Sequence, residues 1–335
     1  MKKGVTALSV TCLLSFMLPG AAYAWNQATH AYIAERLAGP EKSKEMWGST
    51  APDFFNYIFD PTACPGWVSD QTHGTTGETF LKLWNAASTP SEKALAYGFV
   101  SHNQQWGEDY VAHISGLQPG YENDGYIIIK AKQLLDAPLD STNPTSTFGE
   151  VFTGSFGASA EEALLIAHAI AEYAIDLRLQ KEADPSLGRK LAAAARSEAK
   201  SFTPLLLKAY AAEYAANCFN GDLATATTEL TVAVQLHRQD MIYLGQAISR
   251  PEPVAVELLA EQLLAVLGDF LPGPLPDNAV DTLKAAISSA MNLCDDYRTQ
   301  IETTIEFVDK NLKDHGIIDP VQENAQNAPQ TGAAR

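Results

Sequence analysis

The sequence has few basic residues, and after its first 24 residues it has no long apolar run. The chain of 335 residues holds 23 Lys and Arg against 40 Asp and Glu. A surface of that charge repels nucleic acids and anionic membranes unless a local patch or bound cations reverse the field. No later segment has about 20 consecutive apolar residues, so no transmembrane segment is predicted there. A Gly-x-Ser-x-Gly nucleophile elbow is also missing, and no covalent serine nucleophile of that kind is indicated.

Cysteine is scarce and says little about function. Cys12 falls in the apolar run of the leader described below, which leaves Cys64, Cys218 and Cys294. Their spacing does not support a cysteine zinc site. In an oxidising compartment we expect one disulfide and one free thiol. We favour the pair Cys218 and Cys294, because both fall in helical sequence.

The first 24 residues have the pattern of a secretory signal peptide. Lys2 and Lys3 precede an apolar run over residues 5–18, and Ala22-Tyr23-Ala24 is a small-x-small cleavage site. Cleavage after residue 24 of the 335 leaves 311 residues, and loss of the two lysines takes the formal net charge from −17 to −19. We therefore predict a secreted or periplasmic protein whose N-terminus is Trp25.

A new N-terminus at Trp25 offers a metal-binding group that an internal residue lacks. An α-amino group has a pKa near ~8 and loses its proton to a metal ion more readily than a lysine does. Its nitrogen and the Trp25 carbonyl oxygen can chelate one ion, with His30 as a third ligand. The alternative is that Trp25 is simply where the peptidase cuts.

Helical patterns run through the rest of the chain and predict an all-α fold. Gly and Pro residues separate the helical segments from one another. The expected helices span residues 28–37, 41–47, 92–113, 126–135, 160–181, 192–214, 223–244, 254–271 and 280–313.

Two candidate functional residues precede the third of these helices. Asp53 follows Pro52 in a predicted turn, and His73 lies within residues 57–77, where several prolines and glycines predict a loop. An Asp after Pro is commonly a helix N-cap, and a loop His is commonly just exposed. Each residue therefore has a simpler explanation when it is considered alone.

The helix predicted at 92–113 is more informative. His102, Asp109 and His113 fall at offsets of 0, 7 and 11, which places them on one helix face. Two His and one Asp on one face make an unusual core. If the helix is straight, His102 and His113 are separated by about 16 Å and serve different ions, and Asp109 between them can bridge. Glu108 points to the opposite face and is the weaker candidate.

A second helical pair comes from the helix predicted at 160–181. His168 and Glu172 are four residues apart, on one face and about 6 Å apart in rise. Two ligands of one zinc ion on a helix need that spacing. A His and a Glu four apart are also a common surface contact.

Taken in order, these features resemble the bacterial zinc-dependent phospholipases C. The chain has an N-terminal Trp, a His soon after it, an Ala-Pro-Asp turn, a loop His, a helix with His, Asp and His, and a later His-x-x-x-Glu helix. The order is similar to that of the secreted fungal nucleases that cut single strands, which share the fold and the three-zinc cluster. The resemblance covers residues 25–180. It implies a zinc-cluster catalytic core at 25–183, to which we add a helical extension at 184–320 and a disordered tail at 321–335.

The resemblance implies a ligand set for up to three zinc ions. Nine residues match the ligands of the family: Trp25, His30, Asp53, His73, His102, Asp109, His113, His168 and Glu172. Asp53, His73 and His102 would hold the first ion, which Asp109 bridges to a second ion held by the Trp25 main chain and His30. The last three residues would hold a third, more exposed ion with open positions for water and substrate.

The chain departs from the family at the bridging residue. The family has its Asp four residues after the His, where this chain has Trp106. Assigning the role to Asp109 implies an insertion of three residues around 105–107 and an irregular helix at Gly107. A straight helix would leave His102 and Asp109 about 10 Å apart in rise, which is long for ligands of one ion.

Such a cluster implies phosphodiester hydrolysis. A water held between two cations loses a proton near neutral pH, and the hydroxide attacks phosphorus in line. The cations neutralise charge on the phosphoryl oxygens, and the third metal stabilises the leaving alkoxide. Asp53 is the predicted catalytic base that orients this water, if one of its oxygens stays free.

The substrate is predicted to be a phospholipid or another small phosphodiester, with transient contact at a membrane surface. The Ala-Pro-Asp turn looks like the phospholipase branch, and the acidic surface disfavours nucleic acid. The Trp-x4-His spacing instead resembles the nucleases. Phe54, Phe55, Tyr57 and Phe59 can hold a choline head group by cation–π contact, and core packing is the alternative. The rival from another class is a non-catalytic, metal-containing surface binding protein.

Overall fold

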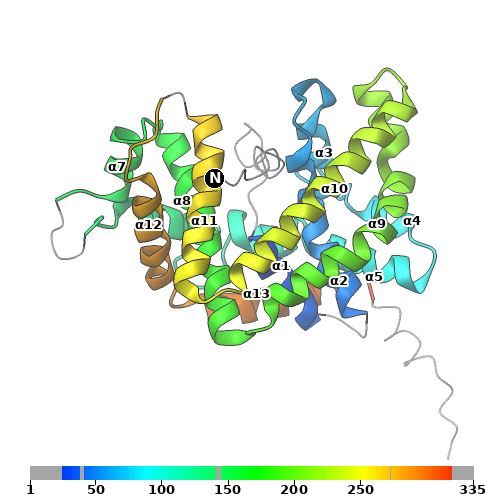
Figure 1. Cartoon of the computed structure of the whole chain (residues 1–335). Coiled ribbons are helices and arrows are strands. Elements are labelled where there is room, and N and C mark those ends of the chain that lie inside the picture. Colours follow the sequence, from blue (N-terminus) through cyan, green and yellow to red (C-terminus); the bar gives the residue numbers. More distant parts are fainter. Residues whose placement is uncertain (1–24, 38–40, 141–144, 272, 319–335) are drawn as a thin grey trace, which may run out of the picture.

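The computed structural model describes residues 25–37, 41–140, 145–271 and 273–318, and these form an all-α fold (Figure 1). Within these ranges the only β pairing is an isolated bridge between Pro138 and Thr147. The predicted fold class is confirmed. The predicted signal peptide and the predicted disordered tail lie outside the described residues.

The helical segments, with 3-10 and π-helical pieces marked η, are α1 (Gln27–Leu37), α2 (Lys42–Thr50), η2 (Ala51–Tyr57), η3 (Pro61–Ala63), α3 (Pro65–His73), α4 (Leu81–Ala86), α5 (Pro90–Ser101), η4 (Tyr110–Ile114), α6 (Tyr126–Asp136), α7 (Phe148–Gly154), α8 (Ala160–Arg178), η5 (Leu179–Ala183), α9 (Leu187–Cys218), α10 (Leu223–Ile248), α11 (Glu252–Phe270), α12 (Ala279–Leu293) and α13 (Tyr297–Asp314).

Several helices begin at caps that the sequence supplies. Thr89, Thr147 and Ser159 each accept a hydrogen bond from the backbone N–H three residues later, where a Glu side chain bonds back to the cap residue. Such capping boxes satisfy amide groups that the first helical turn leaves unpaired. They fix the starts of α5, α7 and α8, and α5 and α8 position candidate ligands.

Asp176 of α8 accepts hydrogen bonds from the first turn of α1. Its carboxylate accepts the backbone N–H of Thr29 at 2.9 Å, the Thr29 hydroxyl at 2.7 Å and the backbone N–H of Ala28 at 3.4 Å. All three donors are buried. Because a buried amide without a partner is costly, these bonds hold α1, which carries His30, against α8.

The prediction of one helix at 92–113 is wrong, because this stretch is broken in two. Helix α5 ends at Ser101, and η4 begins at Tyr110. Between them the Asn103 side chain accepts two backbone N–H groups of a turn. A Cβ at Gly107 would lie 2.4 Å from the Ser101 carbonyl oxygen, so the turn requires a glycine there. The break includes Gly107, where an irregular helix is predicted.

Two other helix predictions also change. The stretch predicted as a loop at 57–77 contains α3, so His73 is the last residue of a helix. The helix predicted at 280–313 is divided into α12 and α13. The remaining predicted helices are present, with ends that differ by a few residues.

The predicted disulfide is wrong for the described residues, in which all three thiols are free. Cys294 is buried. Cys218 instead contacts Cys64, and burial together with this contact raises the pKa of the Cys218 thiol to about 12.

The helices beyond residue 183 pack directly on the segments that carry candidate ligands. Helices α9 and α10 lie side by side (Figure 1), α10 covers η2, and α12 packs on α8. The Tyr57 hydroxyl of η2 donates to Asp240 of α10 at 2.7 Å. Because η2 also carries Asp53, the packing of α10 on η2 helps to hold Asp53 in position. The division at residue 183 stays a prediction.

The aromatic residues after Asp53 lie in the hydrophobic core. Phe54, Phe55 and Tyr57 are buried, and Phe59 is partly buried against them. Core packing is thus the role that their positions support. None of the described helices has the length and apolar character needed to cross a membrane.

Candidate metal centre

Three groups of His, Asp and Glu side chains come together, each with ligand atoms within 4.8 Å of one another. Every side chain predicted as a ligand falls in one of these groups. Group one is Asp53, His73 and His102; group two is His30, His102 and Asp109; group three is His113, His168 and Glu172.

Helix ends and irregular segments supply most of groups one and two. Asp53 lies in the 3-10 segment η2, and His73 is the last residue of α3. His102 follows the last residue of α5, and Asp109 precedes the π-helical η4. Side chains from these separate elements converge on one region of the fold.

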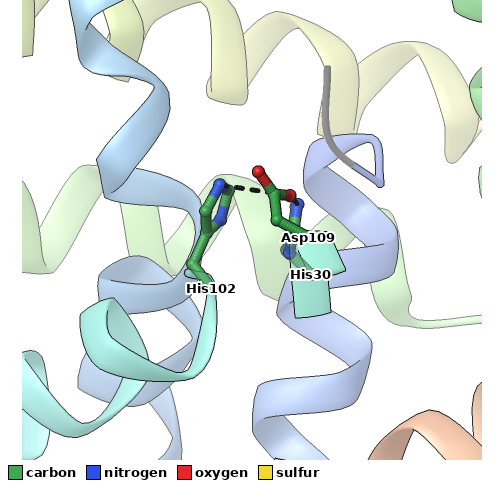
Figure 2. Close-up of side chains that lie close together, drawn as sticks. All are labelled: His30, His102 and Asp109. Atoms are coloured by element: carbon green, nitrogen blue, oxygen red, sulfur yellow. Dashed lines mark ion pairs between the residues drawn. The ribbon is translucent and has the colours of Figure 1, made fainter. Parts of the chain in front are cut away.

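Asp109 is brought back to His102 by the turn after α5. Its backbone N–H donates to the His102 carbonyl at 2.9 Å. Its Oδ1 lies 3.5 Å from His102 Nε2 and 3.6 Å from His30 Nε2, so it faces the Nε2 atoms of both rings (Figure 2). Its Oδ2 lies 3.8 Å from His73 Nε2. The carboxylate therefore faces groups one and two together, as a bridging ligand must.

Hydrogen bonds at Nδ1 orient the three imidazoles of groups one and two. Nδ1 of His73 and of His102 lies 3.1 Å and 2.7 Å from a backbone carbonyl oxygen. Nδ1 of His30 lies 2.6 Å from Glu108 Oε2. Each Nε2 is left to face the other ligand atoms, which is how proteins commonly fix histidines that bind metals.

Glu108, the weaker candidate in the sequence, is not a member of group two but contacts its ligand His30. Besides His30, its carboxylate accepts the Ser101 hydroxyl at 2.5 Å, and its backbone carbonyl accepts the Trp25 indole N–H at 3.0 Å. Glu108 is fully buried, and burial raises its pKa to about 8. The direction of the Glu108 side chain depends on the turn at 102–107, which helical periodicity does not predict. In the sequence, only its position next to Asp109 points to Glu108.

The spacing of the ligand atoms fits small metal ions. His73 Nε2 lies 3.1 Å from His102 Nε2, and His113 Nε2 lies 3.2 Å from His168 Nε2. Around a tetrahedral ion with ligands at about 2.0–2.2 Å, neighbouring ligand atoms are about 3.3–3.6 Å apart. His30 Nε2 and Asp109 Oδ1 are buried without a hydrogen-bond partner among the described residues. Buried polar atoms rarely remain unpaired, so the groups can hold metal ions.

Burial and neighbouring charges shift the protonation of these residues. Burial opposes the charged form of His102, but Asp109 and Asp53 outweigh it and raise its pKa to about 9. Burial lowers the pKa of His30 and of His168 to about 3. At neutral pH in the absence of metal, His102 is therefore protonated, while His30 and His168 are neutral.

Metal binding at groups one and two should tighten as the pH rises. His102 must lose its proton before its Nε2 can bind, so we expect affinity to increase about tenfold from pH 7 to pH 8 and to level off above the His102 pKa. Zinc titration calorimetry in two buffers of different ionisation enthalpy would also show proton release at pH 7. Group three is the internal control, since the His168 pKa is far below this range. Equal affinity at pH 7 and pH 9 in groups one and two would contradict the prediction.

The remaining predicted ligand is the Trp25 main chain. The Trp25 side chain is 1% exposed and is held by its bond to Glu108, just before α1. The residues before Trp25 lie outside the described ranges, so a free amino group there stays a prediction.

Both Asp53 oxygens already have partners. Oδ2 accepts the Gln27 side-chain amide at 2.6 Å, and Oδ1 lies 3.3 Å from His73 Nε2. Burial favours the neutral carboxyl, but His102 and His73 outweigh it and keep the pKa of Asp53 below its usual range. Asp53 is therefore charged and fixed in place, as a metal ligand should be. The role of a base with one free oxygen is not favoured by these contacts.

Comparisons of the chain with protein-family models, with curated proteins and with solved structures gave no match. The three groups and their surroundings are thus the basis for assigning a function.

Proposed function

We propose that this chain is a secreted, zinc-dependent phosphodiester hydrolase of the phospholipase C type. The supporting observation is the position of Asp109, which faces His102 and His30 at 3.5 Å and 3.6 Å and so joins group one to group two. A shared carboxylate between two ligand sets is what a two-ion hydrolytic site needs. The resemblance of the ligand order to bacterial zinc-dependent phospholipases C points to the same chemistry.

In this proposal some residues bind the metal ions, and others hold those ligands in position. Group one and group three would each hold one zinc ion, and the Trp25 main chain, His30 and Asp109 would hold another, with His102 serving group one through its Nε2. When bound, the ions supply an activated water and neutralise charge on the phosphoryl oxygens. Glu108 holds the ring of His30 in place, and Gln27 holds the carboxylate of Asp53. Such outer contacts keep ligands in position without rearrangement during the reaction.

Group three offers the approach for substrate. His113 is partly exposed, whereas the ligands of groups one and two are buried. A phosphodiester therefore reaches the centre most easily from the side of His113. This agrees with the expectation of a third, more accessible ion with open coordination positions.

The substrate class favoured is a phospholipid or another small phosphodiester. A formal net charge of −17 disfavours a polyanion such as single-stranded DNA, which binds mainly through its phosphates. The single-strand nuclease remains the alternative enzyme, and a metal-containing surface binding protein remains the alternative without catalysis.

The test uses protein that begins at Trp25 and is loaded with zinc. It is incubated in parallel with short-chain phosphatidylcholine and with single-stranded DNA, and products are followed by mass spectrometry. Diacylglycerol and phosphocholine with intact DNA would support the phospholipase. Released nucleotides would support the nuclease. A full zinc complement with neither product would point to another phosphodiester substrate or to the binding protein.

One extra residue before Trp25 should weaken zinc binding at group two. The extra residue converts the chelating amino group into an amide, while Trp25 stays anchored to Glu108. We expect one equivalent of zinc to be lost on dialysis and hydrolysis to fall at least about tenfold. Metal analysis and rate measurements check this, with the same residue added at the C-terminus as the control. A fully metallated, fully active extended protein would refute the role of the N-terminus.

A further inference from the structure

A pocket of about 340 Å³ lies between α9 and α10, and none of the candidate metal ligands lines it. Arg189 and Arg196 of α9 line it, together with Arg250, which follows the end of α10. We call these three residues the arginine triad. All three side chains are exposed, so the pocket opens to solvent.

Small residues create the pocket. A Cβ at Gly245 would lie 2.4 Å from the carbonyl oxygen of Gly188, so α9 and α10 are in backbone contact there. Gly245 and Ala192 line the pocket, and neither has a side chain long enough to fill it. The packing of the two helices thus leaves a space surrounded by arginine side chains.

The arginine triad has no ion-pair partner among the described residues, although the chain has an excess of acidic residues. Nearby lysines are paired: Lys190 bonds to Glu35 and Asp184, and Lys181 bonds to Glu252. The whole sequence has 40 acidic residues, yet none of those described lies within ion-pair distance of the triad. Three like charges around one space repel one another unless an anion enters it.

Helix geometry adds to the positive field. Arg189 lies in the first turn of α9, where the helix dipole is positive and favours an anion. Arg196 is seven residues further on, about 10 Å along the same side of the helix. The two arginines therefore line the pocket from positions two helical turns apart, and Arg250 comes from the segment that follows α10.

We propose that the arginine triad binds a phosphate group, either of a small soluble phosphate compound or of an anionic lipid. A guanidinium group presents paired N–H donors that match two oxygens of one phosphate. A phosphate monoester carries a charge of about −1.5 to −2 at pH 7 and three strong acceptor oxygens, so it can serve three guanidinium groups better than one carboxylate can. The volume suits a small ligand. This site does not depend on the proposed hydrolytic function.

The test measures protection of individual arginines. The intact protein is treated with phenylglyoxal with and without 10 mM inorganic phosphate, at constant ionic strength, and each modified arginine is identified by peptide mass spectrometry. If phosphate binds with a Kd of about 1 mM, labelling of the triad should slow about tenfold. Arg36 and Arg298, which bond to Glu302 and to Glu182, are internal controls and should not change.

Further incubations in the same experiment distinguish a soluble phosphate compound from an anionic lipid. Vesicles of phosphatidic acid in phosphatidylcholine are compared with vesicles of phosphatidylcholine alone and with glycerol phosphate. Protection by glycerol phosphate supports a soluble ligand, whereas protection only by the phosphatidic acid vesicles supports a lipid. Equal protection by chloride, or protection by none of the phosphates, would overturn the proposal.

Matched variants test the same point by binding measurements. R189Q/R196Q/R250Q should bind phosphate at least about tenfold more weakly, since all three charges are removed. The control K284Q/K310Q/K313Q removes three charges from α12 and α13 and should leave phosphate binding at the triad unchanged. Circular dichroism checks that both variants are folded, and equal binding by the two would contradict the site.

Discussion

Asp109→Asn should remove zinc from groups one and two and reduce phosphodiester hydrolysis at least about a thousandfold. The carboxylate faces imidazole nitrogens of both groups, at 3.5 Å and 3.6 Å from one oxygen and 3.8 Å from the other. An amide keeps the shape but loses the negative charge and replaces one oxygen with a donor, so it cannot join two cations. Zinc content should fall from three equivalents toward the one held by group three.

The control is Asp124→Asn, because Asp124 forms an exposed ion pair with Lys132 outside the centre. It should keep all zinc and all activity. Glu172→Gln is a second comparison that should cost group three its ion and leave groups one and two occupied. If Asp109→Asn kept full zinc content and hydrolysis, the bridging assignment would be wrong. An unmodified protein with full zinc content but no hydrolysis would favour the binding protein.

The residues that converge in the three groups could be selected from the sequence because the order of residue types survives changes in local structure. His168 and Glu172 needed only helical periodicity, which α8 has without interruption. His102, Asp109 and His113 also fall in the groups, but the single helix on which their selection rests is broken in the structure. Periodicity treats residues 92–113 as one helix, whereas the Asn103 side chain and Gly107 form a turn there.

The residues around His73 mark the ends of a helix, not a loop. The prolines and glycines around it predict a loop, but Pro65 is the first residue of α3 and Gly74 ends it with a left-handed conformation (φ 74°). Proline at the start and glycine just past the end are typical of a helix. The two residues mark the boundaries of α3 and do not exclude it.

Contacts between residues far apart in the chain could not be predicted from the sequence. The bond of Asp176 to Thr29 spans 147 residues, and that of Tyr57 to Asp240 spans 183. Each depends on how complete helices pack, which no local pattern specifies. The same holds for the cysteines. The contact between Cys64 and Cys218 joins the segment before α3 to the end of α9, and it depends on how these elements pack.

Glu108→Gln should lower zinc affinity at group two by about 10- to 100-fold, while group three stays unchanged. Glu108 accepts the Ser101 hydroxyl and lies 2.6 Å from His30 Nδ1. Burial raises the pKa of the free carboxyl to about 8, but a cation on His30 Nε2 requires the proton on Nδ1 and so favours the charged carboxylate as its acceptor. Glutamine has the same shape but cannot become charged.

The measurement is zinc retention against increasing chelator concentration, with hydrolysis followed in parallel. Glu122→Gln is the matched control, because Glu122 is exposed outside the centre. In Glu108→Gln one equivalent should leave at a lower chelator concentration than in the control, and excess zinc should restore most of the activity because the ligand His30 is still present. If instead all three equivalents left together, or none left early, Glu108 would not act through His30. Rescue by zinc is the distinguishing result, since a variant damaged only in its fold would not regain activity when the metal is restored.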